Sequence, residues 1–193
     1  MMYENETSVT VFIDNPNNPP HPSHLTMSEP KTNAMRILDR MKKPYDVITY
    51  DPGDFVSSIE VSKKIGINIE LIYKTLIAQG KSERYYAFVI PGGKELDMKR
   101  AAASVDEKSI ELIHVKDINR LTGYVRGGCS PLGIKRQCKV VIDSSCNSHE
   151  KIYVSGGKLG CTLCVTPKDL IEAASAITSD ISFVPPPEYR KTE

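Results

Sequence analysis

The sequence lacks an excess of either charge, with 25 basic and 24 acidic residues and a formal net charge of +1. A basic surface over the whole chain is therefore excluded, and any contact with nucleic acid must come from a local patch. No apolar run approaches the length of a membrane span. Residues 1–20 lack the basic and apolar regions of a signal peptide. We therefore expect a cytoplasmic protein that makes no contact with a membrane.

Cysteines are few and odd in number, which argues against a disulfide framework and for reduced thiols. The five lie at positions 129, 138, 146, 161 and 164. Cys161 and Cys164 form a lone CxxC pair, for which a zinc or redox site is the alternative. The spacings to the other cysteines and to His149 match no compact zinc module, and the pair lies in a predicted strand rather than at a helix start. We therefore expect structural cysteines, with no metal and no cofactor.

Motifs of the common hydrolase and nucleotide-binding classes are also absent. There is no GxSxG elbow, no HExxH pair and no GxxxxGK[ST] loop. Of the four histidines, two lie in the polar segment 15–24, while His114 lies in an apolar stretch and His149 in a polar turn. The sequence therefore does not predict a nucleophile activated by a histidine base.

Two glycine-rich segments are present instead. The first, TGYVRGGCSPLG at 122–133, holds four glycines and a proline, so it does not form an ordinary helix. The second is YVSGGKLG at 153–160. Glycine lets the backbone approach another group closely, so such loops can present N–H donors to a ligand. A tight structural turn is the alternative for one Gly-Gly pair alone, and the presence of two loops makes a ligand pocket the stronger hypothesis.

Lys74 lies in the otherwise apolar stretch LIYKTLIAQG, where a charged side chain must reach solvent, a carboxylate or a ligand. It can extend to solvent from the end of an element, or it can stand at a pocket rim, where it would bind a ribose or phosphate or polarise an ester carbonyl. Cys129, inside the first glycine loop, is a possible nucleophile. No base is predicted beside it, so we interpret it as a residue that lines the pocket.

The residue pattern predicts one domain with a tail at each end. Residues 1–29 are rich in Pro, Asn, Ser and His with little apolar periodicity, and we expect a disordered arm there. Residues 30–184 are expected to form the domain, and residues 185–193 a polar tail.

Strands outnumber helices in the predicted order of elements. Helices are predicted at 33–43, 57–65, 96–105, 116–123 and 167–177, and strands at 45–50, 74–80, 85–91, 108–115, 139–145, 151–157, 161–166 and from 181 onward. The two types do not alternate strictly. This order favours an α/β fold with a mixed or antiparallel sheet, curled or barrel-like, and helices packed outside it.

Several motifs together resemble the YbaK/EbsC group of aminoacyl-tRNA deacylases, which are relatives of the editing domain of bacterial prolyl-tRNA synthetases. They are KTL at 74–76, TGYVRGGCSPLG at 122–133, VID at 141–143 and VSGGKLG at 154–160. The resemblance runs from about residue 32 to residue 183. It implies a barrel-like mixed sheet surrounded by helices, and hydrolysis of the ester that links a wrong amino acid to tRNA.

The same resemblance implies the site residues. Lys74, Gly127 and Gly128 are assigned catalytic roles, the glycines through their backbone groups. The substrate-binding residues that it implies are Tyr50, Phe55, Thr75, Cys129, Ser130, Pro131, Gly133, Ser155, Gly156 and Thr162. Thr162 stands where related sequences often carry an acidic residue.

The subgroup with TGYVxGGxSPxG and KTL implies hydrolysis of Cys-tRNA(Pro), in which the thiol of the substrate attacks its own ester carbonyl. Deacylation of Ala-tRNA(Pro), or a non-catalytic module that binds RNA or protein, are the alternatives. We expect mischarged tRNA(Pro) as substrate and a transient complex with prolyl-tRNA synthetase, because the balanced charge predicts weak binding of tRNA without a partner. The basic residues expected to meet tRNA are Lys94, Lys99, Arg100, Arg126, Lys135, Arg136 and Lys158.

Overall fold

The structure is a computed structural model that describes residues 10–12, 30–53 and 57–186. Its α-helices are α1 (Asn33–Arg40), α2 (Ser58–Ile65), α3 (Met98–Ser104), α4 (Ile118–Thr122) and α5 (Pro167–Ala174). Its strands are β1 (Thr10–Phe12), β2 (Asp46–Thr49), β3 (Ile72–Gly80), β4 (Tyr85–Pro91), β5 (Glu95–Leu96), β6 (Ile110–Leu112), β7 (Cys138–Asp143), β8 (Ile152–Ser155), β9 (Cys161–Val165), β10 (Ile177–Ser179) and β11 (Ser182–Phe183). No helix in these ranges is long and apolar enough to cross a membrane.

Local sequence signals set the helix ends. Thr32 caps the start of α1, and Ser57 forms a capping box with Glu60 at the start of α2. Gly66 ends α2 in the left-handed conformation. Pro167 occupies the first turn of α5, where its missing N–H costs nothing. These boundaries confirm the helix starts predicted from the sequence.

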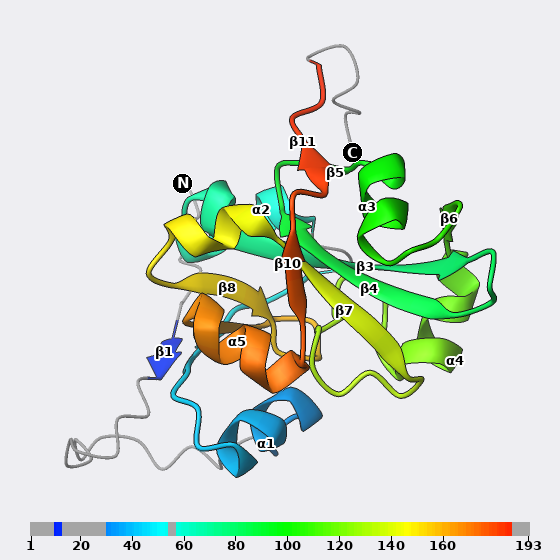
Figure 1. The fold of residues 1–193 in the computed structure, drawn as a ribbon. Coiled ribbons are helices and arrows are strands. Elements are labelled where there is room, and N and C mark those ends of the chain that lie inside the picture. The colour runs from blue at the N-terminus through cyan, green and yellow to red at the C-terminus, as the bar shows by residue number, and fades with distance from the viewer. Residues whose placement is uncertain (1–9, 13–29, 54–56, 187–193) are drawn as a thin grey trace, which may run out of the picture.

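The large sheet has nine strands and is mixed (Figure 1). Its order is β1-β2-β9-β8-β3-β4-β7-β10, and β6 pairs with the end of β3. The pairs β3–β4, β8–β9 and β2–β9 are antiparallel, whereas β3–β8, β4–β7 and β7–β10 are parallel. The predicted mixed sheet with helices outside it is confirmed. Within the described ranges β1 and β10 are the two ends of an open path, so the sheet does not close.

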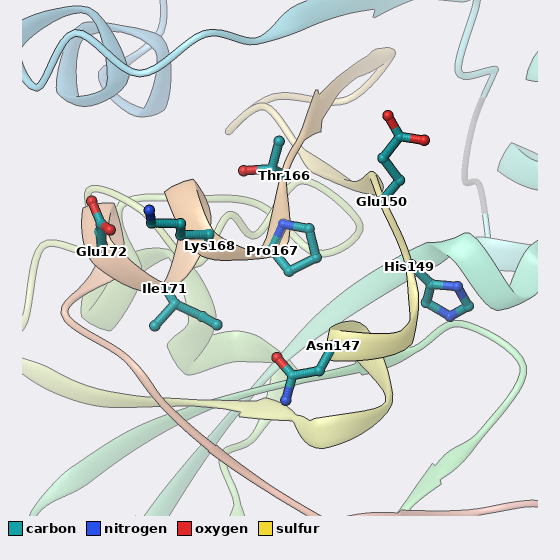
Figure 2. A pocket seen from close by; sticks show the side chains of 8 residues that line it. All are labelled: Asn147, His149, Glu150, Thr166, Pro167, Lys168, Ile171 and Glu172. Carbon is teal, nitrogen blue, oxygen red and sulfur yellow. The ribbon is translucent and has the colours of Figure 1, made fainter.

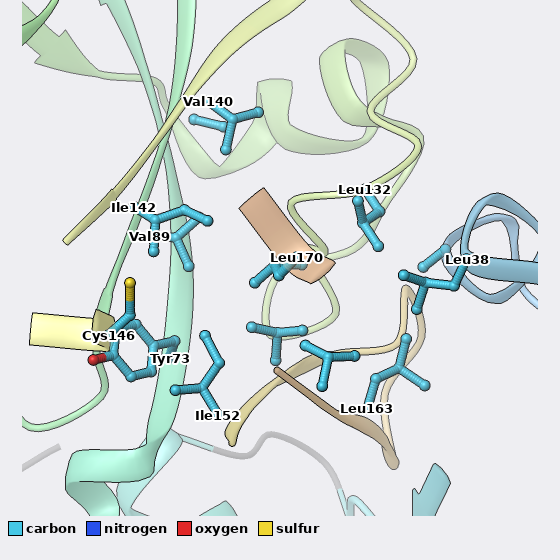
Figure 3. Close-up of a cluster of buried hydrophobic side chains, with 14 of the residues drawn as sticks. Leu38, Tyr73, Val89, Leu132, Val140, Ile142, Cys146, Ile152, Leu163 and Leu170 are labelled. Atoms are coloured by element: carbon cyan, nitrogen blue, oxygen red, sulfur yellow. The ribbon is translucent and has the colours of Figure 1, made fainter. Parts of the chain in front are cut away.

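Different helices cover the two faces of this sheet (Figure 1). The first, which we call the α1/α5 face, packs against α1 and α5 in the largest hydrophobic cluster, to which α1 contributes Leu38 and α5 contributes Leu170 (Figure 3). The other, the α2/α3 face, meets α3 in a cluster that includes Ala101, and it meets α2 in a smaller cluster around Val61.

One edge of β3 is covered only in part. On that side β8 pairs with residues 72–73 and β6 pairs with residues 78–80. On the other side β4 pairs with residues 73–79 without interruption. In the part of the chain that the structure describes, no strand pairs with residues 74–77 on the β8/β6 side, although the Ile113 N–H donates to the Ile77 carbonyl at 3.0 Å.

The structure differs from the sequence prediction at three places. Strand β1 lies within the segment 1–29 that was expected to be disordered: its residues Thr-Val-Phe favour extended backbone and pair with β2. Strand β5 occupies the start of the helix predicted at 96–105, because its backbone pairs with β11. Strand β10 takes the end of the helix predicted at 167–177, because Ser175 ends α5 with φ +47° and Ile177 then pairs with Val141. The other residues of 1–29, and residues 187–193, lie outside the described ranges.

Candidate active site

Four of the predicted site residues lie together on the α2/α3 face. β3 and β8 run parallel, and Lys74 and Ser155 each lie one step beyond the last paired residues, so they point to the same side. Ser155 is directly opposite Thr162 on β9. The Thr162 hydroxyl is hydrogen-bonded to the Tyr50 side chain. The fold therefore gathers residues from four strands or strand ends at one place.

Tyr50 is held by backbone and side-chain contacts. Its N–H donates to the Gly160 carbonyl at 3.0 Å, and its ring packs against the α2 cluster. Burial raises the pKa of the Tyr50 hydroxyl above its usual value, and the hydrogen bond with Thr162 acts in the opposite direction. Tyr50 is therefore a neutral hydrogen-bonding group at neutral pH. Phe55, its predicted neighbour in the pocket, lies outside the described residues.

Lys74 stands between the two apolar clusters of this face. Ile72 belongs to the α2 cluster, and Leu76 packs against the α3 cluster. The Lys74 side chain is 25% exposed, and its Nζ lies 3.5 Å from Oε1 of Glu95. A lysine that was expected to need solvent, a carboxylate or a ligand thus has a carboxylate, and it remains open to solvent.

Thr75 points to the opposite face of β3 from Lys74 because successive side chains alternate along a strand. Its Oγ1 is buried and has no hydrogen-bond partner among the residues described. If Lys74 and Thr75 both bind substrate, the substrate must reach Thr75 at the edge of β3 that is not paired with β8 or β6.

The first glycine loop has several backbone N–H groups without a hydrogen-bond partner among the described residues, and one of them belongs to Gly127. Gly127 is exposed, with φ +80°, and its N–H has no partner within the described ranges. The N–H of Gly128 donates to the Val125 carbonyl at 2.9 Å and so closes a turn. Of the two glycines that were assigned catalytic roles, Gly127 is the one whose N–H is available to a ligand.

The second half of this loop faces inward. Ser130 is fully buried and its Oγ accepts from the Leu132 N–H at 3.3 Å, and Pro131 is buried as well. Gly133 has φ +73°, and a Cβ there would lie 2.9 Å from the hydroxyl of Tyr124. Tyr124 in turn donates its hydroxyl to the Leu132 carbonyl. These contacts on its buried side fix the shape of the loop.

The second glycine loop joins β8 to β9. The N–H of Gly156 donates to the Cys161 carbonyl at 2.9 Å, which closes the hairpin. The Ser155 hydroxyl accepts from the Gly157 N–H at 3.2 Å. Ser155 is half-buried at the rim and keeps the donor capacity of its own hydroxyl.

The two glycine loops touch each other. A Cβ on Gly128 would lie 3.3 Å from the Leu159 nitrogen, and a Cβ on Gly157 would lie 3.0 Å from the ring of Tyr124. Tyr124 therefore supports both loops at once, with its hydroxyl on the first and its ring against the second. The absence of side chains at these glycines allows the close approach.

The cysteines of the site do not form reactive groups. Burial raises the pKa of the Cys129 thiol to about 11, so it is protonated at neutral pH and is a poor nucleophile. Its Sγ lies 3.7 Å from the Val125 carbonyl. Cys161 and Cys164 are three residues apart on β9 and point to opposite faces of the sheet, a geometry that does not suit a shared zinc ion.

Among the basic residues expected to meet tRNA, Arg100 and Arg136 make defined contacts within the protein. Arg100 binds Asp97 at 3.0 Å and also binds Asp180, which holds α3 to the segment before β11. The guanidinium of Arg136 lies 5.1 Å from the centre of the Tyr85 ring. The contribution of the remaining basic residues to tRNA binding stays a prediction.

A pocket of about 510 Å³ lies elsewhere, beside α5 (Figure 2). Lys168, Ile171 and Glu172 line it from α5, while His149 and Glu150 come from the segment before β8. Since α5 covers the α1/α5 face, this pocket is on the opposite side of the sheet from Lys74. It shares no residue with the predicted site, whose residues Lys74, Ser155 and Thr162 lie on the α2/α3 face.

Sequence reasoning missed two residues of this region. Tyr124 lies inside the quoted loop motif, and an aromatic residue among glycines was a signal that could have found it. Glu95 follows a glycine turn and carried no signal, because its approach to Lys74 depends on the β4–β5 turn and on the pairing of β5 with β11.

Comparisons with known proteins identify the family of the chain. The aminoacyl-tRNA editing domain family matches residues 54–173. A protein from Enterococcus faecalis, described as a candidate Cys-tRNA(Pro)/Cys-tRNA(Cys) deacylase, EbsC, is 34% identical over 156 residues, which is 80% of this chain and 95% of that protein. A proline–tRNA ligase from Thermosipho melanesiensis is 28% identical over 99 residues, 51% of this chain but 17% of the ligase.

Solved structures share the fold. The crystal structure of a hypothetical protein has a TM-score of 0.73 and 25% identity, covering 79% of this chain and 100% of that one. The structure of a candidate trans-editing enzyme for prolyl-tRNA synthetase has a TM-score of 0.68 and 20% identity, covering 80% of this chain and 99% of that one. At this identity the second likeness concerns the fold alone.

Proposed function

The chain belongs to the aminoacyl-tRNA editing domain family, and on this premise we propose that it deacylates mischarged tRNA(Pro), with Cys-tRNA(Pro) as the preferred substrate. The observation that carries the proposal is the meeting of Lys74, Tyr50, Ser155 and Thr162 on one face of the sheet, next to two glycine loops that touch each other. The candidate deacylase from Enterococcus faecalis supports the choice of substrate.

The chemistry needs no nucleophile from the protein. The sulfur of the cysteinyl group attacks its own ester carbonyl, the bond between the carbonyl carbon and the ribose oxygen breaks, and the thiol proton passes to that oxygen. Water then opens the resulting four-membered thiolactone and releases cysteine. This route agrees with a site whose own thiol, at Cys129, is held protonated.

The protein positions the ester and stabilises its developing charge. We assign the ammonium group of Lys74 and the N–H of Gly127 as donors to a negatively charged carbonyl oxygen or to the 3′-terminal phosphate. The hydroxyls of Tyr50, Ser155 and Thr162 form a polar wall around the amino acid. Contact with prolyl-tRNA synthetase in the cytoplasm would supply affinity that a net charge of +1 does not.

Deacylation by the purified protein tests the proposal. We expect release of cysteine from Cys-tRNA(Pro), and loss of that activity in Lys74→Ala. Lys81→Ala is the matched control, because Lys81 is also paired with a glutamate but lies in the turn after β3. Full activity in Lys74→Ala would show that the site is wrongly assigned. Faster hydrolysis of Ala-tRNA(Pro) than of Cys-tRNA(Pro) would instead make alanine the substrate.

A further inference from the structure

The backbone of Glu95 is held in place on both sides, although its side chain is 57% exposed. The turn before it is docked on β3, because the N–H of Gly92 donates to the Ile72 carbonyl at 2.6 Å. Glu95 itself pairs with Phe183 on β11. A side chain carried on a backbone held at both ends can serve as a defined recognition group.

The carboxylate of Glu95 can accept further hydrogen bonds. Its only partner among the described residues is Lys74, with 3.5 Å between Oε1 and Nζ. This distance is long for a charged hydrogen bond, which is usually 2.7–2.9 Å. Both groups can therefore accept a ligand of the opposite charge without losing a strong bond to each other.

Other carboxylates near this face are already occupied. Asp97 binds the side chain of Arg100 and caps α3. Asp143 is buried, with its oxygens bonded to Ser145 and to the Ile181 N–H. Asp51, next to Tyr50, accepts from the Gly53 N–H in a local turn.

An aminoacyl ester carries charges that match this pair. Its α-ammonium nitrogen lies about 2.5 Å from the ester carbonyl carbon, as bond lengths and the angle at Cα require. An ammonium group on the protein that faces the carbonyl oxygen therefore needs a carboxylate a few ångströms away for the α-ammonium of the substrate. Lys74 and Glu95 have this spacing, while the hydroxyls of Tyr50, Ser155 and Thr162 carry no charge.

We propose that Glu95 binds the α-ammonium group of the aminoacyl ester, so that the Lys74–Glu95 pair selects esters with a free α-amino group. This inference rests on the proposed function and deepens it. Glu95 does not take part in the bond changes. It orients the amino acid so that the ester carbonyl faces Lys74.

The test compares two substrates on the same tRNA(Pro), cysteinyl and 3-mercaptopropionyl. The second keeps the thiol and the ester but lacks the amino group, and it adds no bulk. The measurement is the ratio of kcat/KM for the two substrates in each variant, so that the intrinsic reactivity of each ester cancels between variants. Glu95→Gln should reduce the preference for the amino substrate by about 10-fold to 100-fold, the size expected for one hydrogen bond between charged groups.

Two further variants make the result specific. Glu111→Gln removes an exposed glutamate that pairs with Lys81 at 3.9 Å, and it should leave the ratio unchanged. Glu95→Asp keeps the charge and should restore part of the preference. Thermal unfolding of each variant confirms that it is folded.

The outcomes separate the two proposals. An unchanged ratio in Glu95→Gln, or an equal loss for both substrates, would overturn the role of Glu95 while deacylation stands. The same change of ratio in Asp51→Asn, with none in Glu95→Gln, would move the amino-group site to Asp51. No hydrolysis of either ester by the wild-type protein would overturn the proposed function, and the inference with it.

Discussion

Tyr124 offers the sharpest test of how the two glycine loops are held together. It is 7% exposed, its hydroxyl donates to the carbonyl of Leu132, and its ring packs against Gly157. Tyr124→Phe keeps the ring and removes only the hydroxyl. The change therefore isolates the contact with the first loop.

The expected cost follows from burial. Leu132 is 2% exposed, so its carbonyl would lose its donor without access to water. A buried polar group left without a partner costs about 1–3 kcal/mol, and we expect a loss of stability in this range. The first loop should also loosen, which should lower kcat/KM for Cys-tRNA(Pro) because the Gly127 donor is no longer held in place.

Urea unfolding of matched variants measures this cost. Tyr45→Phe is the control, because its hydroxyl also donates to a protein oxygen, that of Asp39 at 3.0 Å, but at an exposed site. We expect a change within about 0.5 kcal/mol for the control, as is usual for surface substitutions. Equal losses in the two variants would refute the idea that Tyr124 supports the loop through its hydroxyl.

Three other predictions concern the same region and the core. Gly133→Ala should destabilise the protein more than Gly66→Ala, as thermal unfolding of the two variants would show. Both glycines have positive φ, but a Cβ at position 133 would lie 2.9 Å from Tyr124 Oη, whereas a Cβ at position 66 would have no atom within 4 Å. Burial raises the pKa of the Cys146 thiol from 9.0 to about 11. The stability that this protonated thiol contributes is therefore complete below pH 9 and is lost as the pH rises from 9 to 11. The unfolding free energy of Cys146→Ala should decline less steeply over that window than that of the wild-type protein, and an identical decline would contradict the assignment. Cys129→Ser should keep the deacylation rate of the wild-type protein, and the Cys129 thiol should react slowly with iodoacetamide at neutral pH. Loss of activity in Cys129→Ser would show that the thiol takes part in the reaction.

Local signals made most elements predictable from the sequence. The caps at Thr32 and Ser57 and the apolar strand YYAFVIP mark their elements through interactions between neighbours in the chain. The short strands β5 and β10 were missed because each forms only when a distant strand pairs with it. They are only two and three residues long, too short for an alternating apolar pattern to show.

The candidate site was predictable in its residues but not in its geometry. The motifs named Lys74, Thr75 and Gly128, yet only the structure shows that the Thr75 hydroxyl is buried without a partner among the described residues and that the Gly128 N–H is bonded within the loop. Glu95 was out of reach because its ion pair with Lys74 depends on tertiary packing.

The pairing of Glu95 with Phe183 has a consequence for the order in which the protein assembles. β11 is the last strand that the structure describes, so during synthesis it leaves the ribosome after every described strand of the large sheet. Until then β5 lacks its partner and Glu95 is not yet fixed beside Lys74. A nascent chain can therefore pair the strands of its large sheet while its charge pair is still unassembled, and a chain shortened before residue 182 should lack a competent site.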